Sequence, residues 1–190
     1  MLSHMKKRLL SRWIPLVLVF ACLLHTGCSR EDEPRGLRLG DPAPDFAAKG
    51  IDDKVVVLSS LRGGPVILRF FETNCRFCKA DTPVFKEFYR KYQERGLQVI
   101  YIGSFYEKRD TLQKFVKEMQ LDFPVVMDTE AKLADLYDIR AYPQTLFIGP
   151  DQKILAALLG GVGRAEMQEI LGKYLEEKPS ARKSALEERK

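Results

Sequence analysis

The stretch FFETNCRFCKADTPVF, residues 70–85, holds two cysteines in the spacing C-x-x-C, at Cys75 and Cys78. It begins at the end of the apolar run VILRFF, residues 66–71, which is typical of a strand buried on both faces. It continues into residues 79–94, whose apolar positions recur at helical spacing. The two cysteines are therefore predicted to lie where a buried strand ends and a helix begins.

This position favours redox chemistry at the thiols. The first turn of a helix has unpaired N–H groups and a partial positive charge, which stabilise a thiolate. Arg76 adds a full positive charge beside it. We predict that Cys75 is the nucleophile. Cys78, one turn further on, is predicted to be more buried and placed to attack a mixed disulfide formed on Cys75.

Other uses of the two cysteines fit the sequence less well. A structural zinc site needs four ligands. The other two cysteines, Cys22 and Cys28, and both histidines, His4 and His25, all lie before residue 29. A passive disulfide across so short a loop would constrain little unfolded-chain entropy. A copper site on the two thiols stays open as an alternative. We expect a redox dithiol with no metal and no cofactor, because the thiols themselves carry the electrons.

Two further positions are candidates for the site. Asp81 follows Cys78 by three residues, about one helical turn. It is either a satisfied surface charge or a partly buried carboxylate that modulates proton transfer to Cys78. Pro143 precedes the apolar strand LFI, and its spacing alone does not decide whether the Tyr142–Pro143 bond is cis or trans.

The basic pI of about 9.0 does not indicate nucleic acid as a partner. Four of the 31 Lys and Arg residues lie before residue 29, where there is no Asp or Glu, so the rest of the chain carries 27 basic against 26 acidic residues. With basic and acidic residues so nearly equal in number, the electric field of the protein is too weak to attract a polyanion.

The N-terminus has the layout of an export signal. The basic segment MKKRLLSR precedes a short apolar segment, residues 13–24, and the sequence HTGCS. The apolar segment is too short for a comfortable membrane span. Residues 1–28 resemble a bacterial lipoprotein signal with Cys28 as the lipidated residue; Cys22 offers an earlier, competing match, and an uncleaved anchor is the main rival. We expect the protein on the periplasmic side, membrane-anchored, where disulfide chemistry is possible.

The rest of the chain is predicted to form one α/β domain, residues 37–176, between a tether at 29–36 and a charged mobile tail at 177–190. The last two strands are too close for a crossover helix, so they are predicted to pair antiparallel in a mixed sheet. The predicted strands are 55–58, 66–71, 97–102, 124–127, 145–148 and 154–159, and the predicted helices are 79–94, 110–119, 130–137 and 164–175.

Four motifs come in an order that resembles a known family. They are GDPAPDF at 40–46, LRGGPVILRFF at 61–71, the CRFC motif, and DLYDIRAYPQTLFIGPDQKI at 135–154. Together they resemble the TlpA/ResA-like thiol-disulfide oxidoreductases, extracytoplasmic members of the thioredoxin superfamily. The resemblance implies a thioredoxin-like fold, in which helices flank a mixed central sheet on both faces, with an added N-terminal β-hairpin.

The resemblance also implies roles for residues. Pro143 would be cis and face the dithiol, and the backbone at Tyr142 would pair with an incoming strand. Asp81 would stand where a carboxylate tunes the cysteine pair. The candidate catalytic residues are therefore Cys75, Cys78, Asp81 and Pro143, and the candidate substrate-binding residues are Arg76, Phe77 and Tyr142.

Members of this family reduce apocytochrome c cysteines before haem attachment or supply reductant to other envelope proteins. The implied partners are protein disulfide or dithiol substrates and a membrane-linked or other thiol electron donor. The sequence departs from the family at Glu72–Asn74, where a Trp-Ala-x-Trp segment is common, and at Arg76, Phe77 and Tyr142. These departures leave redox direction and partner choice open.

Two other functions remain as rivals. A peroxiredoxin-like peroxidase of related fold would need proline at position 68 and threonine at position 72, where this chain has Leu68 and Glu72. A non-enzymatic copper- or protein-binding module would be expected to add a distant histidine ligand, and no histidine follows residue 25.

Overall fold

A five-stranded mixed sheet forms the centre of the computed structural model, which describes residues 36–176. The strand order is β5-β4-β3-β6-β7; β3, β4 and β5 run parallel, β6 is antiparallel to β3, and β7 is antiparallel to β6. The bounds are β3 Val66–Phe71, β4 Gln98–Gly103, β5 Val125–Met127, β6 Gln144–Ile148 and β7 Ile154–Leu159. The predicted antiparallel pairing of the last two strands is confirmed.

A separate hairpin precedes the sheet, as the family resemblance implied. Its strands β1, Ala47–Lys49, and β2, Val55–Val57, pair antiparallel. The turn between them reaches the edge strand β5, where the Ile51 N–H donates to the Val125 carbonyl at 2.9 Å. The hairpin is thereby fixed to the side of the main sheet.

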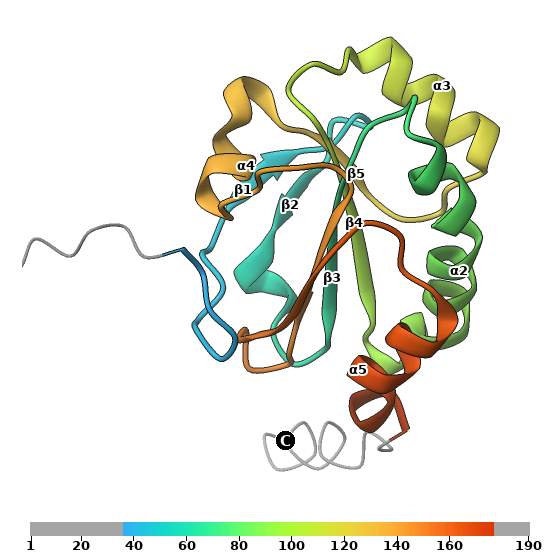
Figure 1. Cartoon of the computed structure of the whole chain (residues 1–190). Helices are drawn as coiled ribbons and strands as arrows, with labels where there is room; N and C mark the ends of the chain where they lie inside the picture. Colours follow the sequence, from blue (N-terminus) through green and yellow to red (C-terminus); the bar gives the residue numbers. More distant parts are fainter. Residues whose placement is uncertain (1–35, 177–190) are drawn as a thin grey trace, which may run out of the picture. The chain divides into compact units, whose positions relative to one another are not determined.

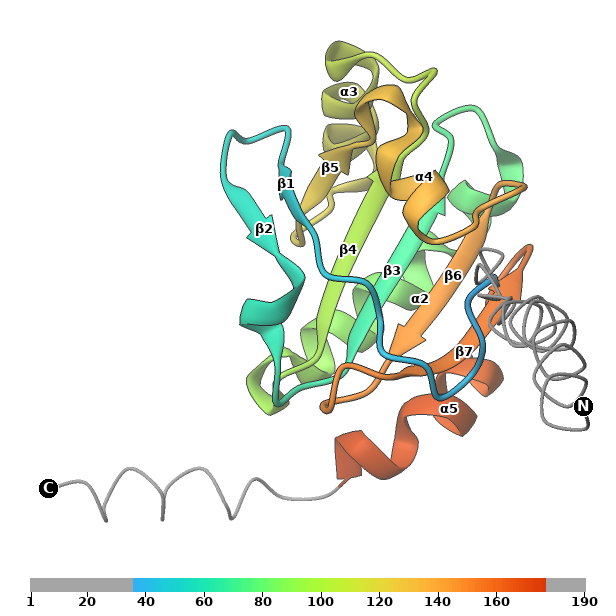
Figure 2. The same ribbon diagram turned by 90° about the vertical axis from the view of Figure 1, so that its left-hand side faces the viewer.

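Helices cover the two faces of the sheet unequally (Figure 1). On one face lie α2 (Arg76–Tyr92), α3 (Arg109–Met119) and α5 (Arg164–Glu176). The other face is covered by the short α4 (Lys132–Leu136), by the 3-10 turn η1 (Leu58–Leu61) and by the chain before β1. Figure 2 shows α4 and this N-terminal segment in front of the sheet, with α2 behind it.

The central strand β3 faces two separate cores. All six of its residues are buried, and they alternate in direction because successive side chains of a strand point to opposite faces. Ile67 and Phe71 lie in the core under α2, α3 and α5, while Val66, Leu68 and Phe70 lie in the core under α4. This explains why the strand is apolar almost throughout.

Two helices begin at different residues than the sequence predicted. The long helix begins at Arg76, three residues earlier than predicted. The predicted helix at 130–137 is a 3-10 turn, η3 (Thr129–Ala131), followed by the five-residue α4. Glu130 and Ala131 have φ values of 61° and 58°, a left-handed conformation that breaks a regular helix.

The expected export signal with Cys28, the tether up to residue 35 and the tail from residue 177 lie outside the described residues. Within residues 36–176, no helix combines the length and the apolar character that a membrane span requires.

Candidate functional site

The two cysteines lie where β3 passes into α2. Cys75 is the N-cap residue of α2, and its sulfur accepts the backbone N–H of Cys78 at 3.2 Å. Both cysteines are free thiols. The sulfur of Cys75 therefore satisfies one of the backbone donors that the first turn of a helix leaves unpaired.

Burial separates the two thiols. Cys75 is partly exposed, whereas Cys78 has 0% exposure. Burial raises the pKa of the Cys78 thiol to about 12; the hydrogen bond to Cys75 acts in the same direction, while the charge of Arg69 acts against it. Cys78 is therefore protonated at neutral pH.

Asp81 is buried behind the dithiol, which excludes the surface-charge interpretation. It is 8% exposed and pairs with Arg69, which is 0% exposed on β3. Oδ2 of Asp81 accepts from Arg69 Nη2 and, at 3.0 Å, from the backbone N–H of Val162. Burial raises the pKa of the Asp81 carboxyl, and the charge of Arg69 opposes that rise.

Arg69 connects this carboxylate to the sheet. Its Nη1 donates to Thr145 Oγ1 at 2.6 Å, on β6, and to the Gly160 carbonyl at 3.0 Å, just after β7. Its guanidinium carbon lies 5.1 Å from the ring centre of Phe85. Arg69 was not among the predicted site residues; the signal for it was a single charged residue inside a run that is otherwise apolar.

A second polar pair, also not predicted, lies beside Cys78. Thr82 Oγ1 donates to the Cys78 carbonyl at 2.6 Å and lies 3.2 Å from the Tyr101 hydroxyl on β4. Burial raises the pKa of Tyr101 well above its ordinary value. These contacts fix the first turns of α2 against the sheet.

The Tyr142–Pro143 bond is cis, as the family resemblance implied. Phe70 of β3 pairs with Gln144 of β6 in an antiparallel register. Continuing this register by one position puts Pro143 beside Phe71, on the path toward Cys75. The Pro143 carbonyl accepts the Gly160 N–H at 2.8 Å.

Exposed aromatic residues lie between the two cysteines in the sequence and in the loop that follows β4. Phe77 is 52% exposed, with the guanidinium of Arg76 4.9 Å from its ring centre. In the connection after β4, Tyr106 is 74% exposed and stacks on Phe105, with ring centres 3.8 Å apart. Glu107 fixes this connection to the residues before Cys75, because its Oε1 accepts the Thr73 N–H at 2.7 Å.

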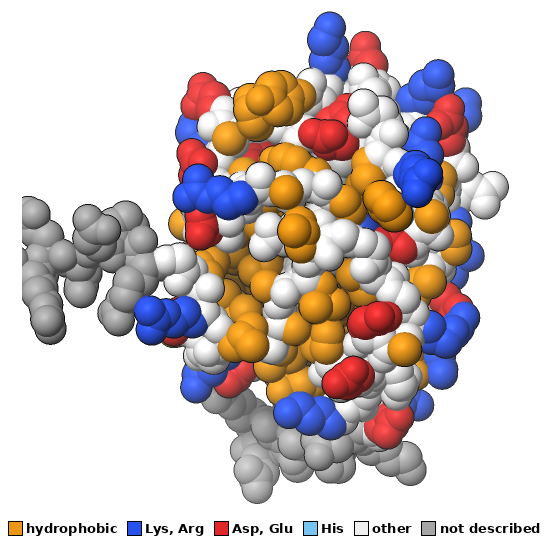
Figure 3. Space-filling view, viewed as in Figure 1, with side chains coloured by type: hydrophobic (Ala, Val, Ile, Leu, Met, Phe, Trp, Pro, Cys, Tyr) orange, Lys and Arg blue, Asp and Glu red, His pale blue; other side chains and the backbone are white. Residues whose placement is uncertain are grey.

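The edge strand β7 also exposes apolar side chains near the site. Leu159, its last residue, is 68% exposed and directly precedes Gly160, which bonds to Pro143. Figure 3 views the molecule from the side of β7, and hydrophobic atoms are exposed in the middle of that face, with charged groups mostly around them.

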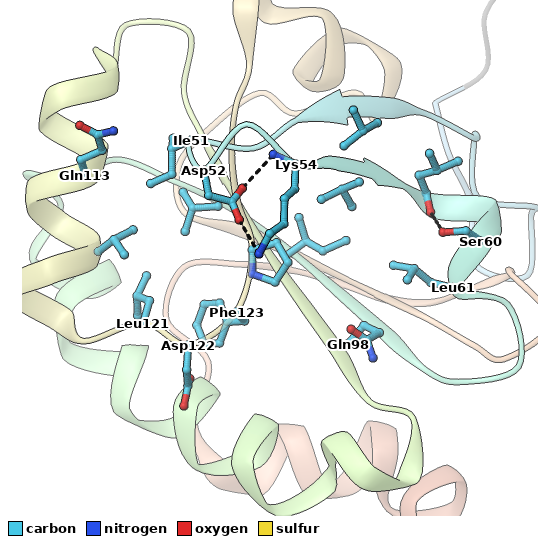
Figure 4. A pocket seen from close by; sticks show the side chains of 17 residues that line it. Ile51, Asp52, Lys54, Ser60, Leu61, Gln98, Gln113, Leu121, Asp122 and Phe123 are labelled. Atoms are coloured by element: carbon cyan, nitrogen blue, oxygen red, sulfur yellow. Dashed lines mark hydrogen bonds and ion pairs between the residues drawn. The ribbon is translucent and has the colours of Figure 1, made fainter.

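A separate pocket of about 690 Å³ lies away from the dithiol, between β2, β4 and α3. Its walls include apolar residues of β2 and β4, and Lys54 pairs with Asp52 inside it (Figure 4). None of the predicted site residues lines this pocket. Among residues 36–176, no three His, Cys, Asp or Glu side chains are grouped so that they could hold a metal ion.

Comparison with known proteins places the chain in a family. The strand order and the helix-covered sheet are those of a thioredoxin-like fold, as predicted. Residues 39–157, more than half of the chain, match the AhpC/TSA family. The chain therefore belongs to the AhpC/TSA family.

Similar proteins carry the name of one enzyme type. Thiol-disulfide oxidoreductase ResA of Oceanobacillus iheyensis is 35% identical over 153 residues, which covers 78% of this chain and 79% of the relative. ResA of Bacillus subtilis is 31% identical over 121 residues, covering 64% of this chain and 67% of the relative. A Chlorobium tepidum structure, provisionally assigned as thiol:disulfide interchange protein DsbE, has 27% identity and a TM-score of 0.68, covering 74% of this chain and 99% of that one. The predicted enzyme class, thiol-disulfide oxidoreductase of the ResA type, is confirmed.

Proposed function

We propose that this enzyme reduces disulfide bonds of other proteins outside the cytoplasm, with Cys75 as the attacking thiol and Cys78 as the resolving thiol. The observation that carries this proposal is the difference in exposure: Cys75 is partly exposed and Cys78 is fully buried. Only an accessible sulfur can meet a disulfide of a partner protein.

In the first step, the Cys75 thiolate attacks one sulfur of the partner's disulfide. A bond forms between Cys75 and that sulfur, and the other partner sulfur leaves as a thiolate that takes a proton from solvent. The attacking sulfur lies at the N-terminus of α2, next to Arg76 in the sequence, where it accepts the Cys78 N–H.

In the second step, Cys78 loses its proton and attacks the Cys75 sulfur of the mixed disulfide. The Cys75–Cys78 bond forms, the bond to the partner breaks, and the partner leaves with both of its cysteines reduced. Because Cys78 is protonated at neutral pH, this step needs a proton acceptor. Asp81, one turn further along α2, takes that role in our proposal.

The partner docks around Pro143. Among the described residues, no backbone group bonds to Tyr142, so its N–H and C=O are available to an extended segment of the partner. Arg76 and Phe77 would contact the partner on the side of the cysteines. No cofactor is required, because the two thiols carry both electrons.

The sequence and the relatives support a substrate class and a location for this proposal. The export-signal layout of residues 1–28 supports a periplasmic, membrane-anchored protein, with Cys28 as the lipidation site. Relatives named ResA and a neighbour named DsbE support protein disulfides as substrates, with apocytochrome c or other envelope proteins as the candidates and a membrane-linked thiol donor as the source of electrons.

The test is disulfide exchange with a reduced, purified protein and a disulfide-bonded peptide. The Cys75→Ser variant is expected to lose exchange, because the attacking sulfur is gone. The Cys78→Ser variant, its matched control, is expected to perform the first step and accumulate the mixed disulfide. A Cys75→Ser variant that still exchanges at the wild-type rate would sink the mechanism.

The reduction potential of the dithiol decides the direction. A value near that of thioredoxin, about −270 mV, supports a reductant, and a value near that of DsbA, about −120 mV, contradicts it. Efficient consumption of peroxide would favour the peroxidase rival, and retention of copper without any reversible thiol-disulfide couple would favour a binding module.

A further inference from the structure

Arg69 is a permanent charge at a position with no access to water. The guanidinium stays protonated in proteins, and Arg69 is 0% exposed. A buried ion pair is weak evidence for stability, because well-packed apolar side chains of similar volume often serve as well. The presence of Arg69 in the central strand, paired with Asp81 one helical turn beyond Cys78, therefore calls for a functional explanation.

The two carboxylate oxygens of Asp81 differ in their hydrogen bonding. Oδ2 accepts from Arg69 and from the Val162 N–H. Oδ1 is buried and has no hydrogen-bond partner among the described residues. The carboxylate is thus held at one oxygen, and the other oxygen keeps its full capacity to accept a proton.

The neighbours of Cys78 supply few alternative acceptors. The charged or titratable groups of this cluster are Cys75 at the N-cap of α2, Asp81 on α2, Arg69 on β3 and Tyr101 on β4. Glu72, between β3 and Cys75, contributes a backbone hydrogen bond to the Cys78 thiol. The segments of β6 and of the β7–α5 connection in this cluster contribute Thr145, Gly160 and Val162, which carry no charge. Of these residues, Asp81 is the one with a buried carboxylate, whereas Glu72 is partly exposed.

We propose that Arg69 is the positioning residue of the resolving step: by binding Oδ2 it keeps Asp81 ionised and oriented so that Oδ1 accepts the proton of Cys78. This inference rests on the proposed function, in which Cys78 resolves the mixed disulfide. The proton passes from Cys78 Sγ to Asp81, the Cys78 electron pair forms the bond to Cys75, and the partner's sulfur leaves with the electron pair of the broken bond.

The two steps can be observed separately with dithiobis(nitrobenzoate) as the disulfide substrate. The attack of Cys75 releases one coloured thionitrobenzoate and leaves the other bound to Cys75. The attack of Cys78 releases the second. Stopped-flow absorbance of the reduced wild-type protein is expected to show two phases, and the rate of each is followed against pH.

The Arg69→Met variant is expected to keep the first phase within about twofold and to slow the second by about tenfold or more at neutral pH, which is a part of the roughly 10²- to 10⁴-fold that a general base contributes. Without Arg69, burial drives Asp81 toward its protonated form, so the second phase also needs a higher pH. A role of Arg69 in packing alone would leave the second phase and its pH profile unchanged, and that result would overturn the proposal.

A double-mutant cycle keeps the test valid if Arg69→Met folds poorly. Asp81→Asn is expected to slow the second phase, and the combined Arg69→Met and Asp81→Asn variant, which removes both charges, is expected to match Asp81→Asn alone. If Arg69→Met slows the reaction further in the Asp81→Asn background, Arg69 does not act through Asp81 and the proposal fails. It also fails if Asp81→Asn resolves at the wild-type rate.

Arg95→Met serves as the matched control. Arg95 follows α2 at its far end and donates to a single backbone carbonyl, that of Leu175, at 2.6 Å. Both phases of this variant are expected at wild-type rates. A wild-type protein that shows no first phase would contradict the proposed function itself, which distinguishes that failure from failure of the role of Arg69.

Discussion

At the residue scale, the two sulfur atoms differ because one meets water and the other does not. The pKa of the Cys78 thiol is raised to about 12, mainly by burial. A raised pKa in the folded state means that folding favours the protonated thiol. The stability that this contributes is complete below the unfolded pKa, near 9, and is lost as pH rises toward the folded pKa.

This linkage predicts an alkaline loss of stability in the reduced protein that depends on Cys78. Between about pH 8 and pH 10, the free energy of unfolding is expected to fall by about 1.4 kcal/mol more in the wild type than in Cys78→Ala. Urea unfolding of both proteins, in the presence of a phosphine reductant, measures the difference. Equal losses in the two proteins would mean that Cys78 titrates as an ordinary exposed thiol.

At the scale of the element, the start of α2 depends on an unusual cap. Ser, Thr, Asp and Asn are the preferred N-cap residues, whereas here the Cys75 sulfur accepts the Cys78 N–H. The apolar spacing predicted a helix from residue 79, and the capping sulfur extends it back to Arg76. The reactive atom and the cap are therefore one atom.

When Cys75 is replaced, the change in the free energy of unfolding is expected to depend on whether the new side chain can still accept a hydrogen bond at the N-cap. Cys75→Ser keeps an acceptor at the N-cap, while Cys75→Ala removes it and should lower the free energy of unfolding by about 1 kcal/mol relative to Cys75→Ser. Chemical denaturation of the reduced variants measures this. Asn74→Ala, at an exposed position outside the helix, is the control and should match the wild type. Equal stability of the two Cys75 variants would show that the sulfur contributes nothing as a cap.

The elements that the sequence predicted well are those whose pattern is local. The bounds of β3 and β7 agree with their apolar runs. In β3 the reason is that consecutive buried positions need apolar side chains. Arg69 was missed because its partners Asp81 and Thr145 are 12 and 76 residues away, and periodicity carries no information on such contacts. The positions of Cys75 and Cys78 in the fold were predictable, but the ion pair behind them was not.

The short α4 illustrates the same limit. The sequence predicted one continuous helix over residues 130–137. The carboxylate of Asp128, which lies before the predicted helix, instead accepts the N–H groups of Leu133 and Ala134 at 2.7 and 2.8 Å. This capping contact starts the helix two residues later than predicted, and the preceding turn takes left-handed conformations to allow it.

At the scale of the whole molecule, the N-terminal segment completes the second core. Phe46 packs edge-on against Tyr137, with ring centres 6.2 Å apart, and the Tyr137 hydroxyl donates to the Pro44 carbonyl at 2.5 Å. Phe70 of the central strand contacts the same tyrosine, with ring centres 5.9 Å apart. The segment before β1 therefore belongs to the same packed unit as β3, the strand that leads to the cysteines.

This packing predicts that the N-terminal segment unfolds together with the sheet. Phe46 is 8% exposed, so Phe46→Ala is expected to lower the free energy of unfolding of the whole domain by about 3 kcal/mol. Val55→Ala is the control, because Val55 lies in the hairpin that follows Phe46, is 64% exposed, and should change that free energy by less than about 0.5 kcal/mol. Denaturant unfolding followed by both fluorescence and circular dichroism is expected to give one coincident, shifted transition for Phe46→Ala. An unshifted main transition with faster proteolysis near the hairpin would instead mean that the segment is a separate appendage, and that the core under α4 is complete without it.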